Sequence, residues 1–232
     1  MIGHRWLRWL GAGIAGAAVL VVGGTYFYIH VIEGPPPAPL TLSGASPSVS
    51  PSTAPSAGRF TTNGEWKVAA GSTAGYRVKE ILFGQSTTAV GRTSEITGSV
   101  TISGTSVTAG SFEANTTTLA SDQSGRDGQV QGRILETNIF PTAGFTLTAP
   151  IALTTLAEGI EASGTATGLL DLHGVKAAVH FVVKAKRAGP ILQVTGSIPI
   201  TFADYNIANP SGGPAQTGDT GTLEFLLALS KV

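Results

Sequence analysis

Four segments of the chain alternate apolar and polar side chains with a period of two residues. Between Glu95 and Ile102, apolar or small side chains take every second position and polar ones lie between them. The same alternation recurs over residues 175–186, 192–202 and 223–229. Successive side chains of a strand point to opposite faces of a sheet, so a half-buried strand produces this pattern. We therefore predict a β-strand in each of these four segments.

Weaker signals of the same kind predict further strands, with Gly- and Ser-rich turns between them. They cover residues 66–70, 73–80, 107–119, 144–149 and 160–170. Eight or more short antiparallel strands are thus expected, and the fold class is all-β. Closing such strands into a barrel removes exposed sheet edges. The pattern by itself leaves a barrel and a sandwich open.

Small residues are frequent inside the predicted strands, where glycine is ordinarily unfavourable. They are Gly98, Gly110, Ala114, Gly164, Ala166, Gly168 and Gly196. Two interpretations remain open: the small residues permit barrel curvature and close packing, or they leave a hollow interior that holds one apolar ligand.

One segment, Ser121–Asn138, interrupts the strand pattern. Its sequence predicts a loop followed by one short helix, and a connection of this length between antiparallel strands usually covers one end of a barrel. Asp122, Arg126 and Asp127 are expected to pair and hold this loop, because one guanidinium can bridge two carboxylates. Contact with the polar head of a ligand is the alternative for these three residues.

Residues 10–32 form an uncharged apolar run of 23 residues. As a helix this run would be about 34 Å long, enough to cross a bilayer core of roughly 30 Å. Arg5 and Arg8 precede the run, and no Lys or Arg follows it before Arg59. The positive-inside bias therefore places residues 1–9 in the cytoplasm and the rest of the chain outside. A cleaved signal peptide is the alternative, but the run is long for a signal core and no A-x-A site follows it.

The remaining chain divides into a linker and one domain. Residues 33–63 are rich in Pro, Ser and Thr, and such a composition predicts an extended tether without a core of its own. Residues 64–232 have a suitable size for a single domain. The expected location is thus the cell membrane, with one pass and an extracytoplasmic domain.

Composition and motifs exclude several classes of function. The formal net charge is zero and there is no Cys, so we expect neither a nucleic-acid partner nor a disulfide. No metal site and no cofactor is expected, because no ligand cluster or glycine-rich phosphate loop is present. Asp171 and His173 share one strand face and form the only candidate pair for acid–base chemistry. No nucleophile or motif accompanies them, and we do not expect an enzyme.

Several motifs together resemble the YceI-like family of lipid-binding, lipocalin-like β-barrels. The motifs are GYRV at 75–78, AVGRT at 89–93, SDQSGRD at 121–127, LETNIFPTAGFTLT at 135–148 and DLHGV at 171–175, followed by the TFADYNI and GDTGTLEF segments. The resemblance covers nearly all of residues 64–232. It implies an eight-stranded barrel whose tunnel binds a polyisoprenoid tail, such as that of an isoprenoid quinone or a prenyl phosphate. The N-terminal helix and linker depart from soluble members and favour a membrane-tethered lipid carrier or store.

The alternation then identifies the side chains that would line such a tunnel. They are Tyr76, Val78, Val100, Ile102, Phe112, Phe145, Leu147, Val179, Phe181, Ile198, Ile200, Phe202, Leu223 and Phe225. Ordinary core packing is the alternative for each of them. A polar ligand head would meet Arg77, Arg92, Arg126 or Arg133 near a mouth. A competing hypothesis is an accessory subunit that docks on a membrane protein complex and whose interior is filled by side chains.

Overall fold

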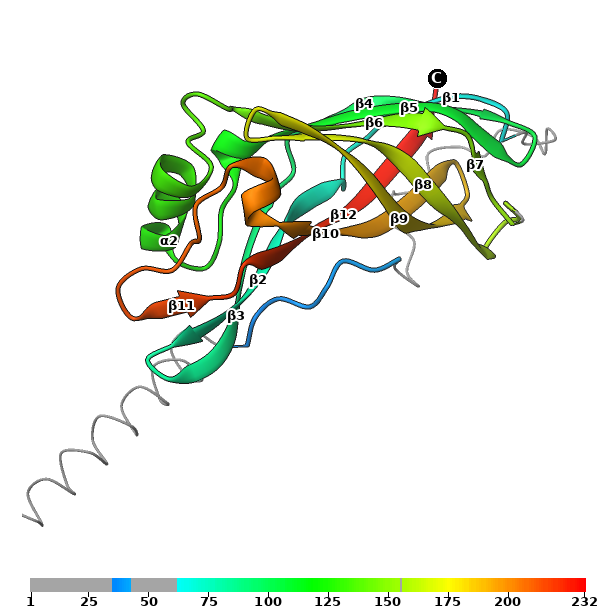
Figure 1. Cartoon of the computed structure of the whole chain (residues 1–232). Coiled ribbons are helices and arrows are strands. Elements are labelled where there is room, and N and C mark those ends of the chain that lie inside the picture. The colour runs from blue at the N-terminus through cyan, green and yellow to red at the C-terminus, as the bar shows by residue number, and fades with distance from the viewer. Residues whose placement is uncertain (1–34, 43–61, 155) are drawn as a thin grey trace, which may run out of the picture.

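A computed structural model describes residues 35–42, 62–154 and 156–232 of the chain, and within them one antiparallel sheet of twelve strands forms (Figure 1). The strands are β1 (Gly64–Val68), β2 (Thr73–Leu82), β3 (Gln85–Thr93), β4 (Ile96–Ser103), β5 (Ser106–Asn115), β6 (Thr142–Ala149), β7 (Ile151–Ala152), β8 (Glu161–Leu172), β9 (Val175–Ala188), β10 (Ile191–Thr201), β11 (Ala215–Thr217) and β12 (Thr220–Lys231).

Eight of these strands close into a barrel. Their order is β1-β4-β5-β6-β8-β9-β10-β12, and β12 pairs with β1 to complete the ring. The closing pairs include Trp66 with Lys231 and Val68 with Leu229. Trp66 and Leu229 are fully buried, so the seam is sealed by large side chains. The predicted all-β antiparallel barrel of eight strands is confirmed, and the sandwich alternative is wrong.

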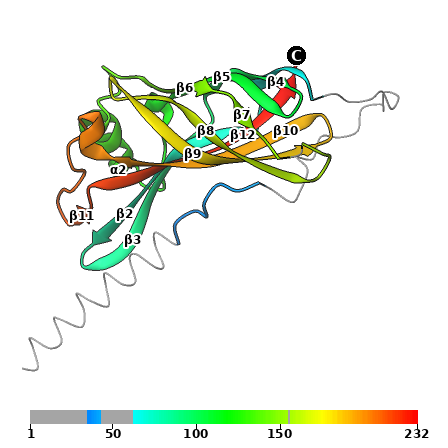
Figure 2. The same cartoon turned by 45° about the vertical axis from the view of Figure 1, so that its right-hand side comes forward.

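The β2–β3 hairpin extends from the barrel at one end. β2 pairs with the first half of β12, next to the point where β1 takes the second half, and β11 pairs with the far end of β2. Phe83 and Gly84 form the two-residue turn at the hairpin tip, with φ of 50° and 81°. Figures 1 and 2 show β3 and β11 projecting at the same end of the barrel.

The segment between β5 and β6 lies across this same end. It contains the 3-10 turn η2 (Thr116–Thr118), the helix α2 (Ser124–Gln129) and the π-helical turn η3 (Val130–Ile134). Together with η4 (Phe202–Tyr205) it faces the projecting hairpin (Figure 1). The predicted insertion with one short helix is therefore present. We call residues 116–136 the lid.

Three aromatic side chains lie directly opposite glycines on the neighbouring strand. The pairs are Tyr76 with Gly91, Phe112 with Gly98, and Phe225 with Gly196. A Cβ atom on Gly91, Gly98 or Gly196 would come within 2.8 Å of the opposing ring. These glycines therefore make room for rings, and close packing is the correct interpretation for Gly98 and Gly196.

The N-terminal predictions fall mainly outside the described residues. The predicted membrane span, residues 10–32, is among the residues that are not described. In the described ranges, no helix has the length and apolar character needed to cross a membrane. Part of the predicted linker, residues 35–42, is described and runs in an extended conformation along the outside of the barrel (Figures 1 and 2).

Candidate functional site

The barrel encloses a cavity of about 980 Å³ that opens at the lid end. This volume is at the upper end of the range of small-molecule pockets. Its wall reaches from Leu192 on β10 through Ile200 and on to Leu82 and Phe83 at the hairpin tip. From Leu192 to Ile200, β10 spans roughly 26 Å at about 3.3 Å per residue. A ligand that fills this space must be elongated and largely apolar.

Most of the predicted tunnel residues border this cavity. They are Tyr76, Val78, Val100, Ile102, Phe112, Phe145, Phe181, Ile198, Ile200, Phe202, Leu223 and Phe225. Leu147 and Val179 are not part of the wall, and both are half-buried against the surrounding apolar core. Contact of any of these residues with a lipid stays a prediction.

Three phenylalanines form a row across the interior. The rings of Phe145 and Phe181 have centroids 5.3 Å apart, and those of Phe181 and Phe225 are 6.0 Å apart, each pair edge to face. This arrangement is favourable for aromatic quadrupoles. Because the rings come from β6, β9 and β12, the row links opposite walls of the barrel through side-chain contacts.

Arg126 on the lid is the centre of a polar cluster at the cavity mouth. Its guanidinium pairs with Asp122, four residues earlier in the loop before α2, and with Glu80 on β2, where the Nη2–Oε1 distance is 3.4 Å. Asp127 does not join this cluster and instead accepts hydrogen bonds from the backbone N–H and hydroxyl of Ser121. The pairing expected for Asp122 and Arg126 is therefore present, whereas Asp127 holds the loop through Ser121.

Burial changes the protonation behaviour of this cluster. Desolvation raises the pKa of Glu80, although the neighbouring Arg126 opposes the rise. Burial also raises the pKa of Tyr76 far above its ordinary range. Burial lowers the pKa of Arg126, but Asp122 and Glu80 outweigh that effect and the net shift is upward. Arg126 therefore remains a cation that is already paired with two carboxylates.

The Tyr76 hydroxyl is the most informative polar atom near the mouth. It is fully buried and has no hydrogen-bond partner among the described residues. Its ring lies between Gly91 and the cavity, and the residue belongs to the cavity wall. An unpaired buried hydroxyl is unfavourable unless a partner from outside the protein satisfies it.

The other arginines suggested by the sequence divide between mouth and outer surface. Arg133 lines the cavity and donates to the Gln129 side chain and the Pro210 carbonyl, at 3.1 and 3.0 Å. Arg77 and Arg92 instead pair with Glu224 and donate to backbone carbonyls of Pro37 and Ala38, outside the barrel. The prediction that Arg77 and Arg92 lie at the mouth of the cavity is therefore wrong.

The possible catalytic pair does not assemble. His173 forms the β8–β9 turn with φ of 51°, and its ring nitrogens face the Tyr205 carbonyl and the Glu136 carboxylate, both at 3.1 Å. Asp171 pairs with Lys176 instead. His173 thus connects the end of the lid to the barrel. In the described part of the chain, no three His, Asp or Glu side chains are grouped to hold a metal ion.

Several residues of the cavity wall could not be identified from alternation. They belong to the lid and to the loops around the mouth, for example Gln129, Val130, Ile134 and Pro210. These segments are not strands, so a period of two carries no information about which side chains point inward. The length of the interruption at Ser121–Asn138 was the only available signal.

Comparisons with known proteins agree with this architecture. A family model described as a YceI-like domain matches residues 66–229. A polyisoprenoid-binding domain from Saccharophagus degradans, implicated in plant cell wall breakdown, superposes with a TM-score of 0.58 at 16% identity, over 73% of this chain and 99% of that domain. BcnA from Burkholderia cenocepacia gives a TM-score of 0.55 at 16% identity, over 69% of this chain and 98% of BcnA.

Identities this low establish a shared fold and no more, and no curated protein is similar enough in sequence to be matched. The family model, by contrast, covers more than half of the chain and includes every barrel strand in whole or in part. The chain belongs to the YceI-like family.

Proposed function

We propose that this chain binds one long-chain isoprenoid lipid in the barrel cavity and acts as a membrane-tethered carrier or store of that lipid. The observation that carries the proposal is the elongated apolar cavity inside a closed barrel, with lid residues bordering its mouth. Each buried CH₂ group contributes about 0.8 kcal/mol, so a long tail gains most from a narrow apolar enclosure. The similarity to a polyisoprenoid-binding domain supports the same class of ligand.

The cavity argues against the accessory-subunit alternative. That hypothesis requires an interior filled by side chains, whereas the interior contains a cavity of about 980 Å³. The candidate acid–base pair gives no support to an enzymatic alternative, since His173 and Asp171 are engaged with different partners. Lipid binding, by contrast, requires only the apolar cavity that the barrel already contains.

Charge at the mouth favours an uncharged lipid head. Arg126 is balanced by Asp122 and Glu80, the unpaired Tyr76 hydroxyl is a neutral donor, and Arg133 is a single further cation in the wall, bonded to a side-chain amide and a backbone carbonyl. A quinone carbonyl accepts a hydrogen bond from such a hydroxyl, whereas a diphosphate requires several uncommitted cations. We therefore propose an isoprenoid quinone or a similar neutral head in preference to a prenyl phosphate.

The membrane tether rests on the sequence. The uncharged run 10–32 precedes the described part of the chain, and the basic residues lie before it. With a span there, the barrel lies on the outer side of the cytoplasmic membrane. Lipid exchange would then take place between the barrel and the membrane that anchors it.

Mass spectrometry of organic extracts tests the proposal. The full chain is purified from its own host, and a stoichiometric isoprenoid is expected. Ala166→Phe places a ring in the cavity and should remove this lipid; Thr167→Phe, on the exposed face one residue further on, should not. Both variants need to retain the wild-type circular dichroism spectrum. Equal lipid in both, or an extract without isoprenoid from the wild type, would refute binding in the cavity.

Tyr76→Phe tests the polar head separately. Removing a buried hydroxyl that lacks a partner should leave the lipid-free protein as stable as before, or stabilise it by up to about 1 kcal/mol. The same change should weaken binding of a quinone by about 1 kcal/mol, roughly fivefold, because one hydrogen bond is lost. Titration of the wild type and the variant with a long-chain quinone and with a prenyl diphosphate measures both effects. Tighter binding of the diphosphate would contradict the neutral-head assignment.

A further inference from the structure

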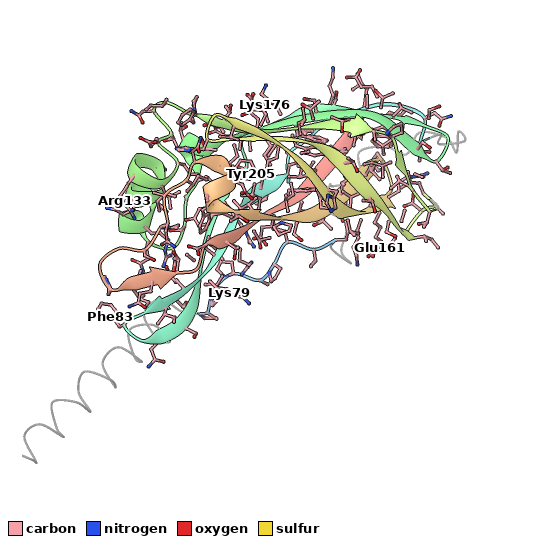
Figure 3. The ribbon with its side chains drawn as sticks, in the orientation of Figure 1. Lys79, Phe83, Arg133, Glu161, Lys176 and Tyr205 are labelled. Carbon is pink, nitrogen blue, oxygen red and sulfur yellow. The ribbon has the colours of Figure 1, made fainter. Side chains whose placement is uncertain are left out.

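The β2–β3 hairpin exposes large apolar side chains at its tip. Ile81 is 45% exposed and Phe83 is 53% exposed, and both adjoin Leu82 in the cavity wall. Figure 3 shows Phe83 at the end of the projecting hairpin, on the same end of the molecule as Arg133. The most exposed part of the hairpin is therefore apolar and adjoins the opening of the cavity.

The first residue of the hairpin turn, Phe83, is of a type that rarely adopts the backbone conformation found there. Phe83 and Gly84 both have positive φ, the geometry of a two-residue turn that favours Asn or Asp at the first position. A bulky side chain is rare there and is unfavourable. Phe83 is not part of the buried core: the residue is 53% exposed and only borders the mouth of the cavity. The ring therefore contributes to something other than the fold of the hairpin.

The N-terminal segment is held against the barrel wall near this end. Residues 35–42, which we call the strap, cross the outside of β3, β2, β12 and β10. Arg77 and Arg92 donate to the carbonyls of Pro37 and Ala38, at 2.6 and 2.5 Å. Leu40 donates to Glu224 at 3.3 Å and accepts from Thr195 at 3.1 Å.

The strap site is buried although it lies on the outer face of the barrel. Glu224 is only 4% exposed and Thr195 only 6%. The Glu224 carboxylate holds both arginines in place, at 2.8 Å from Arg92 and 3.4 Å from Arg77. Prolines limit the strap's freedom before it docks, which lowers the entropy lost on ordering. The strap is thus a fitted contact, and the carbonyls of Pro37 and Ala38 lie against β2 and β3, the strands of the hairpin. Figures 1 and 2 show the strap passing beside β3.

We propose that the hairpin tip, Ile81 to Phe83, is a membrane-docking surface that places the mouth of the barrel against a lipid bilayer. The inference rests on the proposed function in assuming that residues 10–32 span the membrane. That uncharged run ends three residues before the strap begins, and the strap holds this end of the chain against the barrel. The barrel is thereby kept close to the bilayer, with the apolar tip as its contact. Lipid can then pass between bilayer and cavity with little exposure to water.

A fluorescent label at the tip tests the docking. Because the chain has no Cys, Ile81→Cys and, at the opposite end, Thr105→Cys each give a single labelling site for a nitrobenzoxadiazole dye. The full-length labelled protein is reconstituted into phosphatidylcholine–phosphatidylglycerol vesicles that contain a doxyl-labelled phosphatidylcholine. We expect a blue shift and a loss of emission for the dye at position 81, and water-like emission for the dye at position 105.

Phe83→Asn separates membrane contact from folding. Asn suits the positive φ at this position, so the variant should keep or improve its thermal stability. In the Ile81→Cys background it should reduce the quenching by the labelled lipid and slow the transfer of bound lipid to acceptor vesicles. Water-like emission at position 81 in the wild-type background, or equal quenching at positions 81 and 105, overturns the docking surface. Docking without any bound isoprenoid would refute the proposed function and leave the docking surface intact.

Discussion

At the scale of single residues, the interior is defined by rings packed over glycines. Alternation correctly placed Phe225 and Gly196 on inward faces, but it could not show that one fills the space left by the other. That relation depends on strand register, which is set by turn geometry and cross-strand packing over the whole barrel. The sequence therefore identified the wall of the cavity better than its shape.

Gly196→Ala should destabilise the barrel through the Phe225 ring. A Cβ atom at position 196 would lie 2.7 Å from Phe225 Cζ, and overpacking of this kind costs about 1–3 kcal/mol. The double variant Gly196→Ala/Phe225→Leu replaces the ring by a smaller side chain. Its loss of unfolding free energy should be less than the sum of the losses in the two single variants. Urea unfolding of the four proteins measures the coupling. Additive effects would show that the ring moves freely away from position 196.

Glu80 gives the mouth a pH dependence whose sign follows from its burial. The pKa of Glu80 is raised in the folded protein, so the folded state binds this proton more tightly than the unfolded chain does. The stabilising contribution is complete below the ordinary value of 4.5 and is lost as the pH rises through the folded pKa. Glu80→Gln should therefore gain stability relative to the wild type as the pH increases above 4.5. Unfolding free energies of both proteins, measured across this range, check the direction; a constant difference would contradict it.

At the scale of elements, strands with regular alternation were predictable, and so was β2, but its hairpin partner β3 was not. The segment Gln85–Thr93 forms β3, but its sequence mixes small and polar residues without a clear period. Its turn, Phe83-Gly84, lacks the Asn-Gly or Asp-Gly signal of a two-residue hairpin. The strap was equally hidden: composition predicted an extended Pro-rich segment, and its contact with Glu224 depends on residues more than 180 positions apart.

The strap should stay docked only while its two arginines are present. Spin labels at Thr41→Cys and Lys79→Cys, on the strap and on β2, should give a narrow distance distribution by pulsed electron paramagnetic resonance. Arg77→Ala with Arg92→Ala removes the donors to two strap carbonyls, so the distribution should broaden. Lys176→Ala with Lys184→Ala removes two outer cations that pair elsewhere on the barrel, and is the matched control. A broad distribution in the wild type would show that the strap is not held.

At the scale of the whole molecule, the strand pattern left a barrel and a sandwich open, and closure into eight strands was implied by the resemblance to the YceI-like family. The lid was predictable as an interruption, but its attachment was not. It is connected to the barrel by Arg126 with Glu80 and by Glu136 with His173, contacts between segments 37 to 46 residues apart. Polar contacts of this kind leave no periodic signal in a sequence. The position of the cavity mouth, which sets the direction of lipid entry, is visible only in the structure.

Removal of the lipid should lower the stability of the whole domain. A ligand that binds only the folded state stabilises it by about 2.7 kcal/mol at a free concentration one hundred times its Kd. For a domain of this size, such a change corresponds to a melting temperature roughly 5–11 °C lower after extraction of the lipid. Calorimetry before and after extraction, and after adding a long-chain quinone back, measures the change. The Ala166→Phe variant is the control, because its ring occupies cavity volume and its melting temperature should not respond to quinone. An equal response in both proteins would show that the quinone acts outside the cavity.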